Sequence, residues 1–160
     1  VALPRHRVRV LLETTAGQGT SLGYRFEQLA ATLDRVEASH RVGLCLDTCH
    51  LFFAGYDIRS PHGYRTTMRG LATCGGHARV KAIHLNDSRR GLGSRVDRHA
   101  HIGAGCLGSE AFRLFLNDPR FRTVPMILET PKGEDFVTAD RRNLARLRRL
   151  LAGAGPKRTA

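Results

Sequence analysis

The sequence predicts an α/β fold in which the strands of a parallel sheet alternate with helices. Two observations lead to this prediction. Four short apolar runs recur along the chain, and each is followed by a segment whose apolar residues are spaced for one face of a helix. The length of 160 residues suits a single domain with a buried core.

The four apolar runs are the predicted strands. Each is short, rich in leucine or β-branched residues, and ends in an acidic residue or a histidine. Continuous apolar runs of this kind are typical of strands that are buried on both faces of a parallel sheet. The predicted strands are residues 8–13, 42–47, 80–84 and 125–129.

Two helices are predicted in the first half of the chain. We expect Thr20 or Ser21 to cap the first, because their hydroxyls suit a helix N-terminus. Met68 and Leu71 form a weaker apolar stripe before Gly75, which suits the C-terminal end of the second helix. The residues that share the inner face of the first helix are Leu22, Phe26, Leu29, Leu33 and Val36.

Two more helices are predicted in the second half. Ser109 is expected to cap the third helix, and the fourth is expected to follow Thr138. The predicted inward-facing residues are Phe112, Phe115 and Leu116 in the third helix and Leu144, Leu147 and Leu151 in the fourth, whose Arg141, Arg142, Arg148 and Arg149 face largely outward.

We assign residues 1–152 to one domain and expect residues 153–160 to form a frayed tail. Four strand–helix units are fewer than the eight that close a (β/α)₈ barrel. The sheet is therefore predicted to be either an open sheet or half of such a barrel.

The charge of the chain favours a polyanionic partner. There are 26 Lys and Arg residues against 14 Asp and Glu, which gives a formal net charge of +12. Such a charge attracts nucleic acid through its phosphates, although an Arg-rich genome or a surface for a protein partner is the alternative explanation. No signal peptide or long apolar segment is visible, so we expect an intracellular protein without a membrane partner. The four cysteines show no disulfide framework, and Cys45 is interpreted as a small core residue.

The polar ends of the four predicted strands form a candidate metal site. The functional edge of a parallel α/β sheet is the one at the carboxyl ends of its strands. Glu13, Asp47, His84 and Glu129 would therefore converge in one small volume. Clustered carboxylates repel one another unless a positive charge lies among them, and mixed carboxylate and imidazole ligands favour zinc, manganese or iron over calcium.

Three further residues extend this candidate site. His50 follows Asp47 closely enough to turn back toward the same cavity, and the Asp97-Arg98-His99 segment places Asp97 and His99 on one side and Arg98 on the other. Seven candidate ligands exceed the needs of one tetrahedral zinc, so at least two metals are implied, as in phosphoester hydrolases. We expect solvated side chains for His6, His40, His62 and His77 and leave His101 unassigned.

Several segments of the chain, in this order, resemble the endonuclease IV family. The resemblance runs from about residue 8 to residue 151. The segments that carry it are Leu12-Glu13-Thr14-Thr15-Ala16-Gly17-Gln18-Gly19, Cys45-Leu46-Asp47-Thr48-Cys49-His50, Ala54-Gly55-Tyr56-Asp57, His84-Leu85-Asn86-Asp87, Gly93-Ser94-Arg95-Val96-Asp97-Arg98-His99 and Ile127-Leu128-Glu129-Thr130.

This resemblance implies a (β/α)₈ TIM barrel of the xylose isomerase-like kind, of which the chain would be the C-terminal half. It also implies a DNA-repair enzyme with three zinc ions that cleaves double-stranded DNA on the 5′ side of abasic sites and clears blocked 3′ ends in base excision repair. The resemblance implies that Asp47, His84 and Glu129 bind one zinc ion and that Glu13 bridges it to a second. It implies that His50, Asp97 and His99 bind the third. The implied catalytic residues are Glu13 and Glu129, and the implied DNA contact is Arg98.

The family's first four strand–helix units have no counterpart in this sequence, nor do two of its zinc-binding histidines. We therefore expect at most two zinc ions and little or no incision from this chain without an N-terminal half. Two alternatives remain. One is a metal-dependent sugar isomerase or epimerase of the related barrels, which the Asp97-Arg98-His99 motif and the positive charge disfavour. The other is a non-catalytic fragment that binds zinc or nucleic acid.

Overall fold

The computed structural model of this chain describes residues 8–152, so His6 and the predicted tail at 153–160 lie outside the described residues. Its main sheet is parallel throughout, and its strands follow one another in chain order. This arrangement confirms the predicted α/β fold and is that of a partial barrel. The strands are β1 (Val10–Glu13), β2 (Val42–Asp47), β3 (Val80–His84) and β6 (Met126–Ile127).

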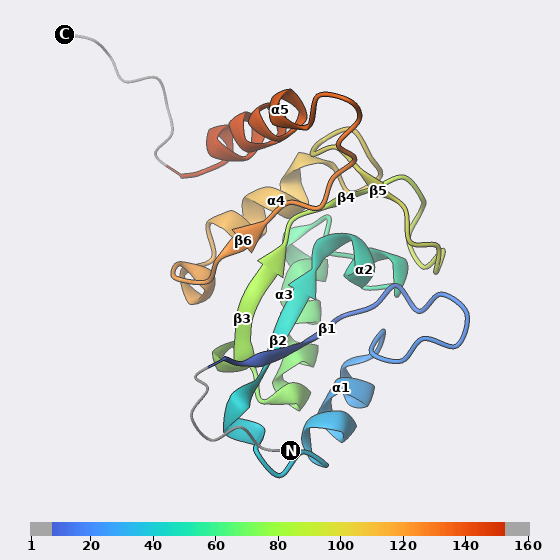
Figure 1. Cartoon of the computed structure of the whole chain (residues 1–160), viewed down its shortest axis with the longest axis vertical. Coiled ribbons are helices and arrows are strands. Elements are labelled where there is room, and N and C mark those ends of the chain that lie inside the picture. The colour runs from blue at the N-terminus through green and yellow to red at the C-terminus, as the bar shows by residue number, and fades with distance from the viewer. Residues whose placement is uncertain (1–7, 153–160) are drawn as a thin grey trace, which may run out of the picture.

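Helices connect the strands and cover one face of the sheet. Figure 1 shows α3 passing behind β2 and β3, and α4 contacts both α3 and α5. A short antiparallel pair, β4 (Asp87–Ser88) with β5 (His99–Ala100), follows β3. The helices are α1 (Phe26–Leu33), α2 (Thr48–Phe53), α3 (Pro61–Gly70), α4 (Gly108–Leu116) and α5 (Phe136–Arg149), with 3-10 turns η1 (Ser39–Arg41), η2 (Leu71–Cys74), η3 (His77–Arg79) and η4 (Pro119–Phe121).

The core lies between the sheet and these helices. Leu44 and Leu46 of β2 and Ile83 of β3 are fully buried, because both strands lie inside the sheet and helices cover them. Phenylalanines from several helices complete the packing, which makes this layer a rigid support for the strand ends. The largest fully buried aromatic side chains are Phe26, Phe52, Phe53, Phe112, Phe115 and Phe121.

Some predicted boundaries in the first half are wrong. β1 begins at Val10 rather than at Val8, which is exposed. α1 begins at Phe26, and Leu22 lies outside it with 73% of its surface exposed. Neither Thr20 nor Ser21 caps this helix, because the side chain of Gln28 reaches back to accept hydrogen bonds from the backbone there. Val36 lies beyond the end of α1 as well.

Other predictions for helix ends have mixed outcomes. Gly75 ends η2 in the left-handed conformation with φ +83°, as predicted, and Met68 and Leu71 are buried. α4 begins at Gly108, one residue before the predicted cap at Ser109. Phe112 and Phe115 are buried as expected, and Leu116 is partly buried.

The fourth predicted helix and the last predicted strand also need correction. α5 begins before Thr138, because the Asp135 side chain caps the helix by accepting a hydrogen bond from the Thr138 N–H at 3.0 Å. Leu147 is buried as predicted, but Leu144 and Leu151 are 39% and 42% exposed. β6 comprises only Met126–Ile127 instead of residues 125–129. None of the helices within residues 8–152 is long and apolar enough to cross a membrane.

Candidate metal centre

The ends of the parallel strands bring the predicted side chains to one edge of the sheet. Glu13, Asp47 and His84 are the last residues of β1, β2 and β3, and Glu129 follows β6 by two residues. Asp47 is directly opposite His84 in the β2–β3 register. Because the strands run in the same direction, all four side chains lie at their carboxyl ends, as the sequence predicts.

Three carboxylates surround the imidazole of His84. Its Nδ1 lies 3.0 Å from Glu13 Oε1, 3.0 Å from Glu129 Oε2 and 3.8 Å from Asp47 Oδ2. One possible ligand atom from each of the four residues lies within 4.8 Å of the others. This is a compact set of three oxygens and one nitrogen.

A second set adjoins the first. The Nε2 atoms of His50 and His99 lie 3.4 Å apart, and the Asp97 carboxylate reaches them at 3.2 Å and 3.3 Å. His99 Nε2 is also 3.8 Å from Asp47 Oδ2, so Asp47 lies between the two sets. Two imidazole nitrogens aimed at the same point, beside a carboxylate, form an arrangement that suits a shared cation.

Local structure explains how His50 reaches this point. Asp47 caps α2 by accepting a hydrogen bond from the His50 N–H at 2.9 Å, which places His50 one turn into the helix and back over the strand end. Its Nδ1 donates to the Thr14 carbonyl at 2.7 Å. The ring is thereby oriented with Nε2 toward Asp97 and His99.

Asn86 makes hydrogen bonds to two members of the cluster and was not among the predicted site residues. It is fully buried, and its Nδ2 donates to Asp47 Oδ2 at 2.7 Å. Its Oδ1 accepts a hydrogen bond from the Glu129 N–H at 2.9 Å, so one amide positions two predicted ligands. Thr48 in turn exchanges hydrogen bonds with the Asn86 backbone at 2.7 and 2.9 Å. The sequence signal was the position of Asn86 two residues after His84, on the same side of an extended chain.

Cys45 belongs to the surroundings of the cluster as well as to the core. It is buried, as the sequence indicates, and it lies opposite Glu13 in the β1–β2 register. One possible ligand atom each of Cys45, Glu13 and His84 lies within 4.8 Å of the others. Thiolate sulfur suits zinc, so Cys45 offers a soft sulfur donor beside a set of possible ligands whose other atoms are nitrogen and oxygen.

The charges of the cluster are strongly coupled. Hydrogen bonds with Cys45 and Glu13 raise the pKa of His84 to about 11, although burial opposes this. Burial by itself would lower the pKa of His50, but Glu13, Asp47 and Asp97 raise it to about 9. Burial would also raise the pKa of Glu13, but its hydrogen bonds with the two histidines lower it to about 2. The carboxylates thus draw positive charge into the cluster, as a bound metal ion would supply it.

Asp47 is the exception among the acidic groups. Its side chain is fully buried, and this burial raises the pKa of the carboxyl against the charges of His50 and His99. An acid in such a place is stabilised when a cation binds close to it. The nitrogen and oxygen donors present here fit zinc, manganese or iron.

Arg98 lies beside the cluster, and its side chain is exposed. Its guanidinium donates to the Asp97 carbonyl at 2.6 Å. It lines an open cavity of about 390 Å³ together with Thr15, Ala16, Gln18, Ser21, His50 and Asp97. A cation on the rim of a polar cavity, next to a possible metal site, is suited to a phosphate group.

The remaining histidines of the described chain lie outside this cluster. His40 and His62 are exposed, as predicted. His77 is partly buried and contacts Arg120, which corrects the prediction of a solvated side chain. His101 accepts a hydrogen bond from Asn143 at 3.1 Å. The predicted ligand set is thus brought together completely, whereas its binding of metal stays a prediction.

Comparisons with known proteins agree with this geometry. A model of the xylose isomerase-like TIM barrel family matches residues 2–151. The chain is 63% identical over 145 residues to a probable endonuclease 4 of Chloroflexus aurantiacus, covering 91% of this chain and 50% of that protein. It is 55% identical over 150 residues to a probable endonuclease 4 of Geobacter sulfurreducens, covering 94% and 50%.

A solved structure is also similar. The crystal structure of endonuclease IV from Thermus thermophilus matches with a TM-score of 0.75 and 42% sequence identity, over 88% of this chain and 48% of that one. The chain spans about half the length of the curated relatives it matches. These findings confirm the resemblance to endonuclease IV, and the chain belongs to the xylose isomerase-like TIM barrel family.

Proposed function

We propose that this chain carries part of a zinc-dependent site for phosphodiester hydrolysis in DNA repair. The observation that carries the proposal is the convergence of four carboxylates and three imidazoles at the carboxyl ends of the parallel strands. Multi-metal sites with carboxylate and histidine ligands are typical of phosphoester hydrolases. The relatives named as endonucleases support the same class of reaction.

Two zinc sites follow from the two sets of side chains. Asp47, His84 and Glu129, together with Glu13, would hold one ion, and His50, Asp97 and His99 would hold the other. Bound zinc would supply Lewis-acid stabilisation of the phosphate charge and lower the pKa of bound water.

Glu13 and Glu129 are the proposed catalytic carboxylates. Each has a carboxylate oxygen 3.0 Å from Nδ1 of His84, and both side chains are partly exposed. They can therefore reach an incoming water and the phosphate, which the fully buried Asp47 cannot. Their role is to orient the attacking water and to hold its proton.

Double-stranded DNA with an abasic site is the proposed substrate. The formal charge of +12 favours a polyanion, and Arg98 places a cation on the rim of the cavity beside the cluster. The resemblance to endonuclease IV, which the relatives support, points to cleavage on the 5′ side of the lesion and to the removal of blocked 3′ ends. This would place the reaction in base excision repair.

The described residues provide ligands for two zinc ions but not for a third. Because His84 is assigned to the first ion, a third ion bridged through Glu13 would have only that shared carboxylate and the buried Cys45 thiol as ligands from this cluster. Zinc sites normally use three or four protein ligands. We therefore propose at most two tightly bound zinc ions and weak or no incision by this chain on its own, with activity restored by the segment of the relatives that the chain does not span.

The test is an incision assay on a duplex that carries one abasic site. The chain is assayed alone, with a chelator, and with the complementary segment of the Chloroflexus aurantiacus relative. We expect chelator-sensitive cleavage 5′ to the lesion only when both segments are present. Robust incision by the chain alone, or none with both segments despite a folded complex, would overturn the proposal.

A further inference from the structure

A second concave site lies on the helical layer of the molecule. It is a cavity of about 550 Å³ between α3 and the turns η3 and η4. η3 leads into β3, and η4 precedes β6, so this cavity is near the amino ends of the strands. The candidate metal centre is at their carboxyl ends. The residues that line the cavity are His62, Arg65, Met68, Arg69, Ala72, His77 and Arg120.

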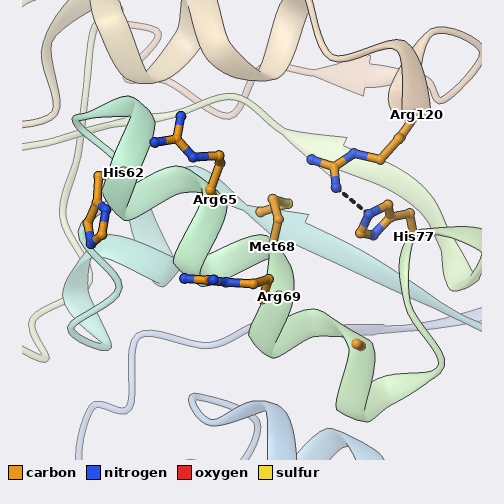
Figure 2. A pocket seen from close by; sticks show the side chains of 7 residues that line it. His62, Arg65, Met68, Arg69, His77 and Arg120 are labelled. Atoms are coloured by element: carbon orange, nitrogen blue, oxygen red, sulfur yellow. Dashed lines mark hydrogen bonds between the residues drawn. The ribbon is translucent and has the colours of Figure 1, made fainter.

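One face of α3 provides most of the polar groups. His62, Arg65 and Arg69 are spaced by three and four residues, which places them on one side of the helix. Figure 2 shows these three side chains projecting from α3, with Arg120 and His77 on the other side of Met68. The cavity therefore has cationic groups on opposite walls and the buried Met68 between them.

The lining carries three guanidinium groups and no carboxylate. Arg120 is paired with Asp118 at 2.5 Å, but the Arg65 side chain makes no hydrogen bond or ion pair within residues 8–152. Arg69 donates only to the Thr66 hydroxyl, at 3.2 Å, within the described chain. Two arginine side chains thus lack an acidic partner, and like charges gathered in one cavity repel each other until an anion joins them.

His77 adds an unsatisfied polar atom. Its Nε2 contacts the Arg120 guanidinium, which is always a donor, so Nε2 must accept and the ring proton lies on Nδ1. That Nδ1 is buried and is the one such side-chain atom of residues 8–152 with no hydrogen-bond partner. Burial, and then the charge of Arg120, lower the pKa of His77, which agrees with a neutral ring. His77 thus brings an unpaired donor and no negative charge to the wall of the cavity.

We propose that this cavity binds a small oligophosphate, such as the di- or triphosphate group of a soluble metabolite. Guanidinium forks match phosphate oxygens, and several forks on two walls suit several phosphates in a row. The volume is within the range of small-molecule sites, which are typically about 300–1,000 Å³, so this partly open cavity suits such a ligand better than a DNA duplex. This site is independent of the function proposed for the metal centre.

The two methionines of the chain allow a direct test. Met68 lines the cavity, whereas Met126 is in β6 and lies outside it. Inorganic tripolyphosphate is titrated into metal-free, methyl-labelled protein, so that chelation of zinc plays no part, and Met68→Leu assigns the signals. We expect the Met68 methyl signal to shift with saturation and the Met126 signal to stay in place.

Variants locate the binding. Arg65→Ala with Arg69→Ala should weaken tripolyphosphate binding about tenfold or more, and Arg65→Lys with Arg69→Lys should weaken it less. Arg141→Ala with Arg148→Ala, which removes the same charge from the exposed face of α5, should leave the affinity unchanged. Circular dichroism shows whether each variant is folded, and the lysine variant gives the comparison if the alanine variant is not.

Three results would overturn the proposal. The first is no shift of the Met68 signal at millimolar tripolyphosphate. The second is an equal loss of affinity in the α3 and α5 variants, which would indicate attraction by net charge alone. The third is a loss of affinity for a short DNA duplex in the α3 variant without any loss for tripolyphosphate, which would make the cavity part of a DNA surface.

Discussion

The candidate metal centre and the cavity beside α3, called the α3 cavity below, are both polar and both contain histidine. They differ in how their charges are arranged. At the strand ends, each imidazole has carboxylates within 4 Å, and the acids are drawn together around positive groups. In the α3 cavity the guanidiniums gather with no carboxylate in the lining. The first arrangement suits a bound cation and the second suits a bound anion.

The two regions also differ in how they are held. The predicted ligands at the candidate metal centre are positioned by strand register and by hydrogen bonds with Asn86 and Thr14. Arg65 and Arg69 of the cavity extend from the exposed face of α3 and lack such support, whereas Arg120 is held by Asp118. Rigid positioning suits metal coordination, whereas flexible cationic side chains suit an anion of less defined shape.

The largest effect is expected from removing a ligand at the centre of the first set. His84→Ala should lower zinc affinity by more than about 100-fold, because it removes the atom that three carboxylates surround. Affinity is measured by competition with a chromogenic chelator. His40→Ala, at an exposed histidine outside the cluster, is the matched control and should bind zinc as the unsubstituted chain does. Equal affinity in both variants would remove His84 from the site.

A smaller loss is expected from the residue that positions two ligands. Asn86→Ala should lower zinc affinity by about 10–100-fold, because Asp47 and Glu129 lose their shared partner. Asn143→Ala is the control, since Asn143 is also fully buried and makes several hydrogen bonds, but to His101, Thr130 and Ile102. Both variants should be destabilised, and only the first should bind zinc weakly. Parallel losses in the two would mean that the effect is on folding alone.

The pH dependence of the free energy of unfolding tests the Asp118–Arg120 pair, whose arginine forms part of the wall of the α3 cavity. Burial would raise the pKa of Asp118, but hydrogen bonds from Arg120 and from Tyr64 lower it. A carboxyl group whose pKa is lower in the folded state than in the unfolded state stabilises the fold at any pH above the unfolded-state pKa. This stabilisation is lost as the pH falls through the folded-state pKa. Asp118→Asn should cost about 1–3 kcal/mol near neutral pH and less in acid.

Denaturant unfolding at several pH values, from neutral to well below the usual pKa of an aspartate, measures this difference. Glu110→Gln is the comparison, because the Glu110–Arg113 pair is exposed and screened by solvent. Its stability should follow that of the unsubstituted chain at every pH. If Asp118→Asn behaves in the same way, the buried hydrogen bonds around Asp118 do not stabilise the fold.

The sequence predicted the strand ends better than the helix ends. The order of the strands and the convergence of Glu13, Asp47 and His84 follow from short apolar runs that each end in a polar residue, although β1 and β6 are only partly buried. Helix ends depend on local alternatives that periodicity does not show. At α1 the Gln28 side chain replaces the expected hydroxyl cap, and at α5 the Asp135 cap begins the helix earlier than Thr138.

The inner face of α5 shows a second limit. Leu144 and Leu151 have helical spacing with Leu147 but are exposed, whereas the polar Asn143 is fully buried. Its hydrogen bonds to three other residues explain its burial, and no pattern of apolar residues could reveal them. The same is true of Asn86, whose importance depends on contacts with Asp47 and Glu129 across the sheet.

The most direct test of the metal centre is to locate zinc in crystals of the chain by anomalous scattering at the zinc edge. We predict two peaks, one among Glu13, Asp47, His84 and Glu129 and one among His50, Asp97 and His99. Zinc bound only elsewhere, or no zinc bound by folded protein at saturating concentration, would contradict the metal centre. A third strongly occupied peak beside Glu13 would contradict the limit of two ions.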